Sequence, residues 1–97
     1  MENERKLNLG KVVVTRGIDE EMHKDKLFEV FIMESLSSFE SCDWGDTYKE
    51  DKEINEEALK NGERILAVYT YPKTRQKIWI ITEWDRSVTT ILFPNEY

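Results

Sequence analysis

The feature that most constrains the fold is a set of three closely spaced alternating segments between Arg64 and Pro94. Apolar side chains recur there at every second position, which is typical of β-strands. The segments cover residues 64–71, 77–84 and 87–93, and they are separated by turns at 72–76 and at Asp85-Arg86. Such short connections join antiparallel neighbours. We therefore predict that a three-stranded antiparallel sheet forms the core of the domain.

Further elements are expected before this sheet. Three consecutive valines, with their high β-propensity, predict a first strand over residues 9–15. Asp19 is a suitable N-cap for a short helical turn over 19–22. Apolar residues at three- and four-residue spacings then predict a helix over 25–39.

A second helix is expected to begin either at Thr47, which opens a capping box with Glu50, or at Asp51. Asn61-Gly62 is a strong C-terminal stop signal. The predicted class is α+β, in the order β-α-α-β-β-β. It has an antiparallel sheet of about four strands, with both helices packed on one face. The first strand joins an edge of the sheet next to a partner that the sequence does not specify.

The chain of 97 residues has room for one hydrophobic core. We expect a flexible N-terminus over residues 1–8 and a single domain over 9–97. The one cysteine, Cys42, excludes an intramolecular disulfide and indicates a reducing compartment. No apolar run is long enough to span a membrane, and no apolar segment follows the charged start as in a signal peptide. The expected location is the cytoplasm, without membrane contact.

Acidic residues are concentrated between Glu34 and Glu57. Nine acids and only two bases, Lys49 and Lys52, give this segment a charge of −7. The other eleven acids and twelve bases give the rest of the chain +1. The net charge of −6 argues against direct nucleic-acid binding, because phosphates attract basic surfaces.

The acidic segment has two interpretations. It is either a solvated surface that keeps the protein soluble, or a surface that binds a protein partner. In the second case it could mimic nucleic-acid phosphates and occupy the basic cleft of a defence nuclease, as anti-restriction or anti-CRISPR inhibitors do. Self-association into a homodimer, through an exposed last strand or through Trp79, is a further alternative. The candidate partner-binding residues are Asp43, Asp46, Glu50, Asp51, Glu53, Glu56 and Glu57.

Catalytic signatures are weak. His23 and Cys42 are the only histidine and cysteine, His23 lies in a charged stretch, and the acid beside Cys42 disfavours a reactive thiolate. Carboxylates next to tryptophans, such as Glu83 and Asp85 around Trp84, would suit a small acid–base enzyme. Asp43 and Asp46 flank Trp44-Gly45 in the same way. Turn formation and cross-strand pairing explain Asp85 and Glu83 more simply, so we expect no enzyme and no catalytic residues.

Metal and cofactor signatures are also weak. A zinc site would need several cysteine and histidine ligands. The acids between Asp43 and Asp51 lack the spacing of a calcium-binding loop, and the glycines are isolated and form no phosphate-binding loop. We expect no metal and no cofactor.

Several segments resemble one protein family. They are VVVTRGI (12–18), DWGD (43–46), ALKNGER (58–64) and IWIITEWDRSVTTILFP (78–94). With these, the chain is similar to small Firmicutes proteins of unknown function described as plasmid-related or as type I restriction endonuclease subunit M. A methyltransferase subunit needs a glycine-rich cofactor loop and a proline-containing base-flipping motif, and the chain has neither. The resemblance therefore implies a mobile-element setting, without an activity. Within it we expect a non-enzymatic accessory protein that acts by protein–protein interaction.

Overall fold

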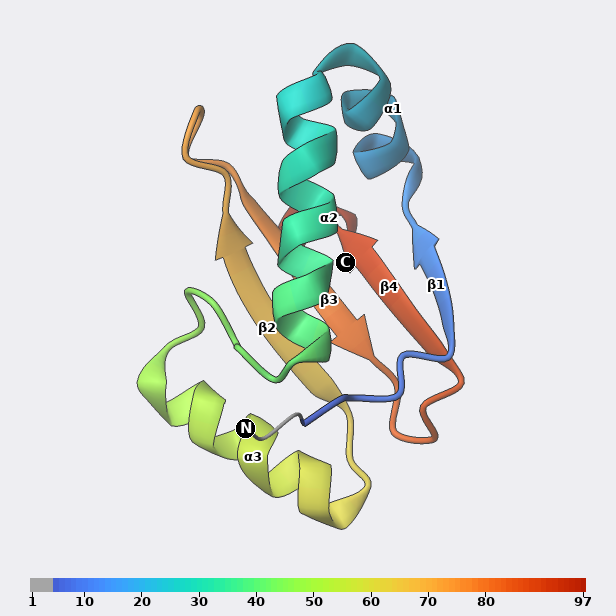
Figure 1. Cartoon of the computed structure of the whole chain (residues 1–97), viewed down its shortest axis with the longest axis vertical. Coiled ribbons are helices and arrows are strands. Elements are labelled where there is room, and N and C mark those ends of the chain that lie inside the picture. The colour runs from blue at the N-terminus through green and yellow to red at the C-terminus, as the bar shows by residue number, and fades with distance from the viewer. Residues whose placement is uncertain (1–4) are drawn as a thin grey trace.

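Four strands form one mixed sheet in the order β1-β4-β3-β2, with three α-helices packed on one face and at its margins (Figure 1). The structure is a computed structural model that describes residues 5–97. The strands are β1 (Lys11–Val14), β2 (Ile65–Thr70), β3 (Lys77–Thr82) and β4 (Val88–Leu92). The helices are α1 (Arg16–Lys24), α2 (Lys26–Glu40) and α3 (Lys49–Asn61), and the 3-10 turn η1 (Pro94–Glu96) ends the fold.

The α+β class and the antiparallel arrangement of β2, β3 and β4 are confirmed. Ile80 at the centre of β3 faces Ala67 of β2 and Ile91 of β4. The prediction of a wholly antiparallel sheet was wrong, because β1 pairs with β4 in parallel, with Val12 opposite Thr89. A valine-rich segment promotes a strand without specifying its direction. The direction follows from where the chain enters the sheet, beside the turn between β3 and β4.

Two of the predicted helices are present, and a third was missed. The predicted turn at 19–22 is part of the longer α1, whose N-cap is Thr15 instead of Asp19. The Thr15 hydroxyl accepts the Ile18 amide hydrogen at 3.4 Å, so the cap lies at the end of the preceding strand segment. The structure places α2 within one residue of its predicted range.

The start of α3 also differs from its prediction. Its N-cap is Tyr48, which makes no side-chain capping bond, and Thr47 forms no capping box. The Thr47 hydroxyl donates to the Trp44 carbonyl at 2.5 Å and accepts from the Val68 amide at 2.9 Å. The predicted end is confirmed, because Gly62 follows α3 in the left-handed conformation.

One face of the sheet is covered by α2, which lies across it in Figure 1. Phe28, Ile32 and Phe39 of α2 are buried in the same core as the inward side chains of β2, β3 and β4. By contrast, α3 lies along the outer edge of β2, where the Asn55 amide pairs with the Leu66 backbone. The two predicted helices therefore do not lie side by side on one face.

The opposite face of the sheet is covered only in part. Instead of an α-helix, η1 and the C-terminal Tyr97 cover part of it, with the Tyr97 ring edge-on to Trp79 at 5.5 Å between centroids. Arg64 lies over the Tyr97 ring at 5.3 Å. Leu66 and Val68 of β2 remain half-exposed. This uncovered area leaves room for a pocket.

The N-terminal segment contributes to packing before residue 9. Residues 1–4, part of the predicted flexible N-terminus, lie outside the described residues. Leu7 is buried in the core, and its amide donates to the Glu40 carbonyl at 2.8 Å. Arg5 reaches Glu56 of α3 at 2.7 Å. Within residues 5–97, no helix combines the length and the apolar character needed to cross a membrane.

Asp25 links the start of α2 to the hairpin loop through hydrogen bonds. Its ionisation makes the stability of the fold depend on pH in the acidic range. Its carboxylate accepts the amides of Leu27 and Phe28, and the Tyr71 hydroxyl donates to it at 2.8 Å. The pKa of Asp25 lies below its ordinary value, because the Tyr71 hydrogen bond, the two amides and nearby Lys73 all favour the ionised carboxylate.

A carboxyl group whose pKa is lower in the folded state than in the unfolded state stabilises the protein at pH values above its unfolded pKa, which is about 3.9 for an aspartate. This stabilisation is lost as the pH falls through the folded pKa. We expect the free energy of unfolding to fall more steeply below about pH 4 in the wild type than in Asp25→Asn. Urea unfolding at a series of pH values measures both curves. Parallel curves would contradict this role of Asp25.

Candidate binding surface around the start of helix α3

The edge strand β2 is sealed by the segment before α3 and by α3 itself. The Asp46 amide donates to the Val68 carbonyl at 2.8 Å, and the Asp46 carboxylate accepts from the Thr70 amide at 2.9 Å. Asn55, only 3% exposed, satisfies both backbone groups of Leu66. An open strand edge would offer unpaired groups to other chains. Backbone and side-chain groups together pair with this edge and hold the segment that leads to Tyr48 in place.

Trp44 and Gly45 anchor the same segment. Trp44 is 4% exposed, packs edge-on against Phe39, and donates its indole N–H to Glu56 at 2.9 Å. Gly45 adopts φ +63° and forms an isolated parallel β-bridge with Val68. The run from Asp43 to Asp46 therefore has a structural role.

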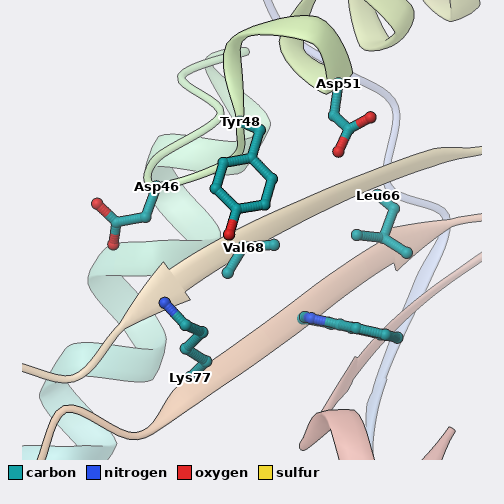
Figure 2. Close-up of a pocket in the computed structure, with 7 residues that line it drawn as sticks. Asp46, Tyr48, Asp51, Leu66, Val68 and Lys77 are labelled. Carbon is teal, nitrogen blue, oxygen red and sulfur yellow. The ribbon is translucent and has the colours of Figure 1, made fainter.

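A pocket lies between this segment and the uncovered face of the sheet. Its volume is about 260 Å³, and it is lined by Asp46, Tyr48, Asp51, Leu66, Val68, Lys77 and Trp79. Figure 2 shows the Tyr48 ring beside β2, with Asp46 and Lys77 to one side of it and Asp51 and Leu66 to the other. Tyr48 is 78% exposed, although the backbone next to it is fixed. The pocket thus combines an apolar floor, two aromatic rings and charged groups at its rim.

The exposed face of α3 continues from this pocket as an acidic row. Glu50, Glu53 and Glu57 are exposed and lie on one helical face with Ile54, at the spacing of successive turns. They line a second, open hollow together with Ile54 and Glu56. Ile54 is 58% exposed in its centre. This arrangement gives a charged surface with an apolar contact point.

The seven predicted partner-binding acids fall into two groups. Three have internal roles: Asp43 accepts from the Gly45 amide, Asp46 binds Thr70, and Glu56 binds Arg5 and Trp44. The hydrogen bond from Arg5, with that from Trp44, holds the pKa of Glu56 below its usual value. The other four make no ion pair with another residue in the described part of the chain. They are Glu50, Asp51, Glu53 and Glu57.

The sequence did not identify Tyr48, Lys77 and Trp79 as neighbours in one pocket. The sequence relates only two of them, because alternation places Lys77 and Trp79 on the same side of one predicted strand. Trp79 was predicted only as a dimer contact. Tyr48 comes from a distant segment. Their meeting depends on the pairing of residues 45–47 with Val68, which no local pattern indicates.

The structure separates the residues considered for catalysis. His23 precedes α2 and Cys42 follows it, so the two lie at opposite ends of that helix. Cys42 is buried, and burial raises the pKa of its thiol. Among residues 5–97, no group of three potential metal-binding side chains is found.

The acids beside Trp84 are engaged in the turn. The Asp85 carboxylate accepts from the Ser87 amide and hydroxyl, and Glu83 lies 3.6 Å from Arg64. Arg86 donates to the carbonyls of Glu63, Glu83 and Ala58 and so joins this turn to the end of α3. Trp84 itself is 66% exposed and lines neither of the two hollows described above.

No protein-family model, curated protein or solved structure matches this chain.

Proposed function

We propose that the protein is a non-catalytic binding protein that holds a basic surface of a protein partner against α3. The observation that carries this proposal is the row of Glu50, Glu53 and Glu57, exposed and without ion pairs to other described residues. Opposite charges across an interface accelerate association and orient the partner. Ile54 in the middle of the row adds an apolar contact. By contrast, the acids with internal partners lie outside this row.

The partner class that this row favours is a nucleic-acid-binding protein. Glu50 and Glu57 are seven residues apart, which is about 10 Å along a helix. A DNA strand carries a phosphate about every 3.4 Å of axis, so about four phosphates span the same length when both ends are counted. Three glutamates occupy it here. A basic cleft shaped for a nucleic acid could accept α3 in its place, which supports the alternative of an inhibitor of a defence nuclease.

The resemblance to plasmid-related proteins suggests the setting of this interaction. In that setting the protein would be an accessory factor of a mobile element, acting in the cytoplasm of the host. A small carboxylate-based enzyme is the weaker alternative, because Asp46, Glu83 and Asp85 are engaged in hydrogen bonds or an ion pair. Homodimerisation through Trp79 is a separate proposal, tested by sedimentation. The other predicted route, an exposed last strand, was wrong, because β4 lies between β1 and β3.

Reversing the acidic row should remove the interaction. In a variant with Glu50→Lys, Glu53→Lys and Glu57→Lys, we expect capture of the partner from host lysate to fall at least about tenfold, because like charges then face each other. Quantitative mass spectrometry of the captured proteins measures this loss. A matched control reverses Asp19, Glu20 and Glu34, which are exposed and lie on α1 and α2. Equal capture by all three proteins would refute the proposed surface.

Competition by nucleic acid distinguishes a partner that binds nucleic acid from a partner that does not. If α3 mimics a nucleic acid, duplex DNA or RNA should displace the protein from the captured partner, and capture should weaken as salt is raised. A partner that binds no nucleic acid would exclude mimicry while leaving the protein–protein interaction in place.

A further inference from the structure

We infer that the pocket between β2, β3 and the start of α3 receives one arginine side chain of the partner. This inference rests on the proposed function, because it names the residue by which a basic partner is anchored. It is carried by a different part of the surface, namely the uncovered face of the sheet and the residues from Asp46 to Asp51.

The size of the pocket fits a single side chain. Its volume of about 260 Å³ lies below the range of about 300–1,000 Å³ that is usual for small-molecule and cofactor sites. Pockets that receive one anchoring side chain of a partner are small and lie within a larger contact surface. The acidic row of α3 supplies that larger surface next to the pocket.

The lining of the pocket matches the two chemical parts of arginine. Leu66 and Val68 offer an apolar floor for the aliphatic stem, which remains favourable when the charged end stays near water. Tyr48 and Trp79 line the pocket with aromatic rings, on which a planar guanidinium can stack. Asp51 offers a carboxylate with no ion pair to another described residue.

Arginine suits this lining better than lysine does. A guanidinium stacks on aromatic rings and binds a carboxylate with two parallel hydrogen bonds, whereas an ammonium is a compact and strongly hydrated charge. Because aromatic rings and a carboxylate line the same pocket, the pocket favours the planar guanidinium of arginine over the ammonium of lysine.

The backbone of the pocket wall is fixed before any partner binds. Asp46 and Thr47 are attached to β2 by three hydrogen bonds of 2.8 to 2.9 Å, and Tyr48 follows them directly. Asp51 lies in the first turn of α3, whose position Asn55 fixes. A binding site that needs no ordering loses less entropy on association.

Two cations of the protein lie near the pocket: Lys77 in its lining, and Arg64 in an adjoining hollow that shares Asp51, Leu66 and Val68 with it. Lys77 lies on the Asp46 side of Tyr48 in Figure 2, whereas Asp51 lies on the other side. Lys77, as the cation in the lining itself, repels a bound guanidinium, whereas the Asp51 carboxylate attracts it. Removal of Lys77 should therefore strengthen arginine binding, whereas removal of the Asp51 charge should weaken it.

Two blocked hexapeptides of glycine and serine test this inference, one with a central arginine and one with lysine at the same position. Chemical-shift changes of the Trp79 indole N–H in the full-length protein report the binding. We expect the arginine peptide to bind about fivefold more tightly than the lysine peptide. Tyr48→Ala should abolish this preference, Asp51→Asn should weaken binding of the arginine peptide, and Lys77→Ala should strengthen it. Trp84→Ala, which removes an exposed tryptophan outside the pocket, is the matched control and should change nothing.

Equal affinity of the two peptides, or an unchanged preference in Tyr48→Ala, would overturn the inference. So would an unperturbed Trp79 signal. Tyr48 and Asp51 are exposed, so their variants are expected to fold. The outcome is separable from that of the proposed function. Loss of capture after reversal of the acidic row, without arginine preference, would refute only the anchor. Arginine preference with undiminished capture would refute only the acidic row.

Discussion

Gly45→Ala is expected to destabilise the protein by roughly 3 kcal/mol and to lower Tm by about 15 °C. A Cβ at this position would lie 2.4 Å from the Tyr69 ring and 2.8 Å from the Val68 carbonyl oxygen, in a backbone conformation of φ +63°. The left-handed conformation alone costs a non-glycine residue about 1–2 kcal/mol. Overpacking against a buried ring and a strand backbone adds a similar amount. Thermal and urea unfolding measure the loss.

Gly62→Ala is the matched control for this prediction. Gly62 has nearly the same φ, +67°, but nothing lies within 4 Å of the position that a Cβ would take. Its replacement should therefore cost only the conformational part, about 1–2 kcal/mol. If the two variants were equally stable, close packing around Gly45 would not be what fixes the segment from Asp46 to Tyr48.

Local sequence patterns predicted the elements whose pattern of burial they reflect, but not the pairing of distant segments. Alternation predicted the three antiparallel strands, and apolar spacing predicted α2, because these patterns directly reflect which side chains are buried. Asn61-Gly62 likewise marked the end of α3. The direction of β1 was not predictable, since it depends on contacts with β4, far along the chain.

The role of Thr47 was misjudged for a related reason. A hydroxyl three residues before an acid satisfies the local capping pattern, yet its hydrogen bonds go to Trp44 and to Val68 in β2. A local pattern gives no information on a competing long-range partner. Tertiary pairing with an edge strand outweighed the helix cap here.

The candidate surface was predictable in charge but not in detail. The sequence located the acids, and four of the seven candidates make no ion pair with another described residue. It could not show that Glu56 is held by Arg5 and Trp44. The pocket was missed because Tyr48 and Trp79 meet only through the sheet register and the attachment of residues 45–47 to β2.

That attachment leads to the second prediction, Asn55→Leu. Leucine has a similar size and a higher helix propensity, so it keeps α3 helical while it removes both amide hydrogen bonds to Leu66. Each backbone group left unpaired without access to water costs about 1–3 kcal/mol. We expect a loss of roughly 3 kcal/mol in the free energy of unfolding, measured by urea denaturation.

The same substitution should change the association state, because α3 without the Asn55 amide detaches more readily from β2, and the edge that it uncovers then pairs with a second chain. Sedimentation of Asn55→Leu at micromolar concentration should reveal dimers or larger species at a temperature where the variant is folded. Asn61→Leu introduces the same residue at an exposed site in the last turn of α3 and should stay within about 0.5 kcal/mol of the wild type. Equal stability of the two variants would show that the Asn55 amide does not hold α3 on the sheet. The positions of Tyr48 and Asp51 in the arginine pocket would then need another cause.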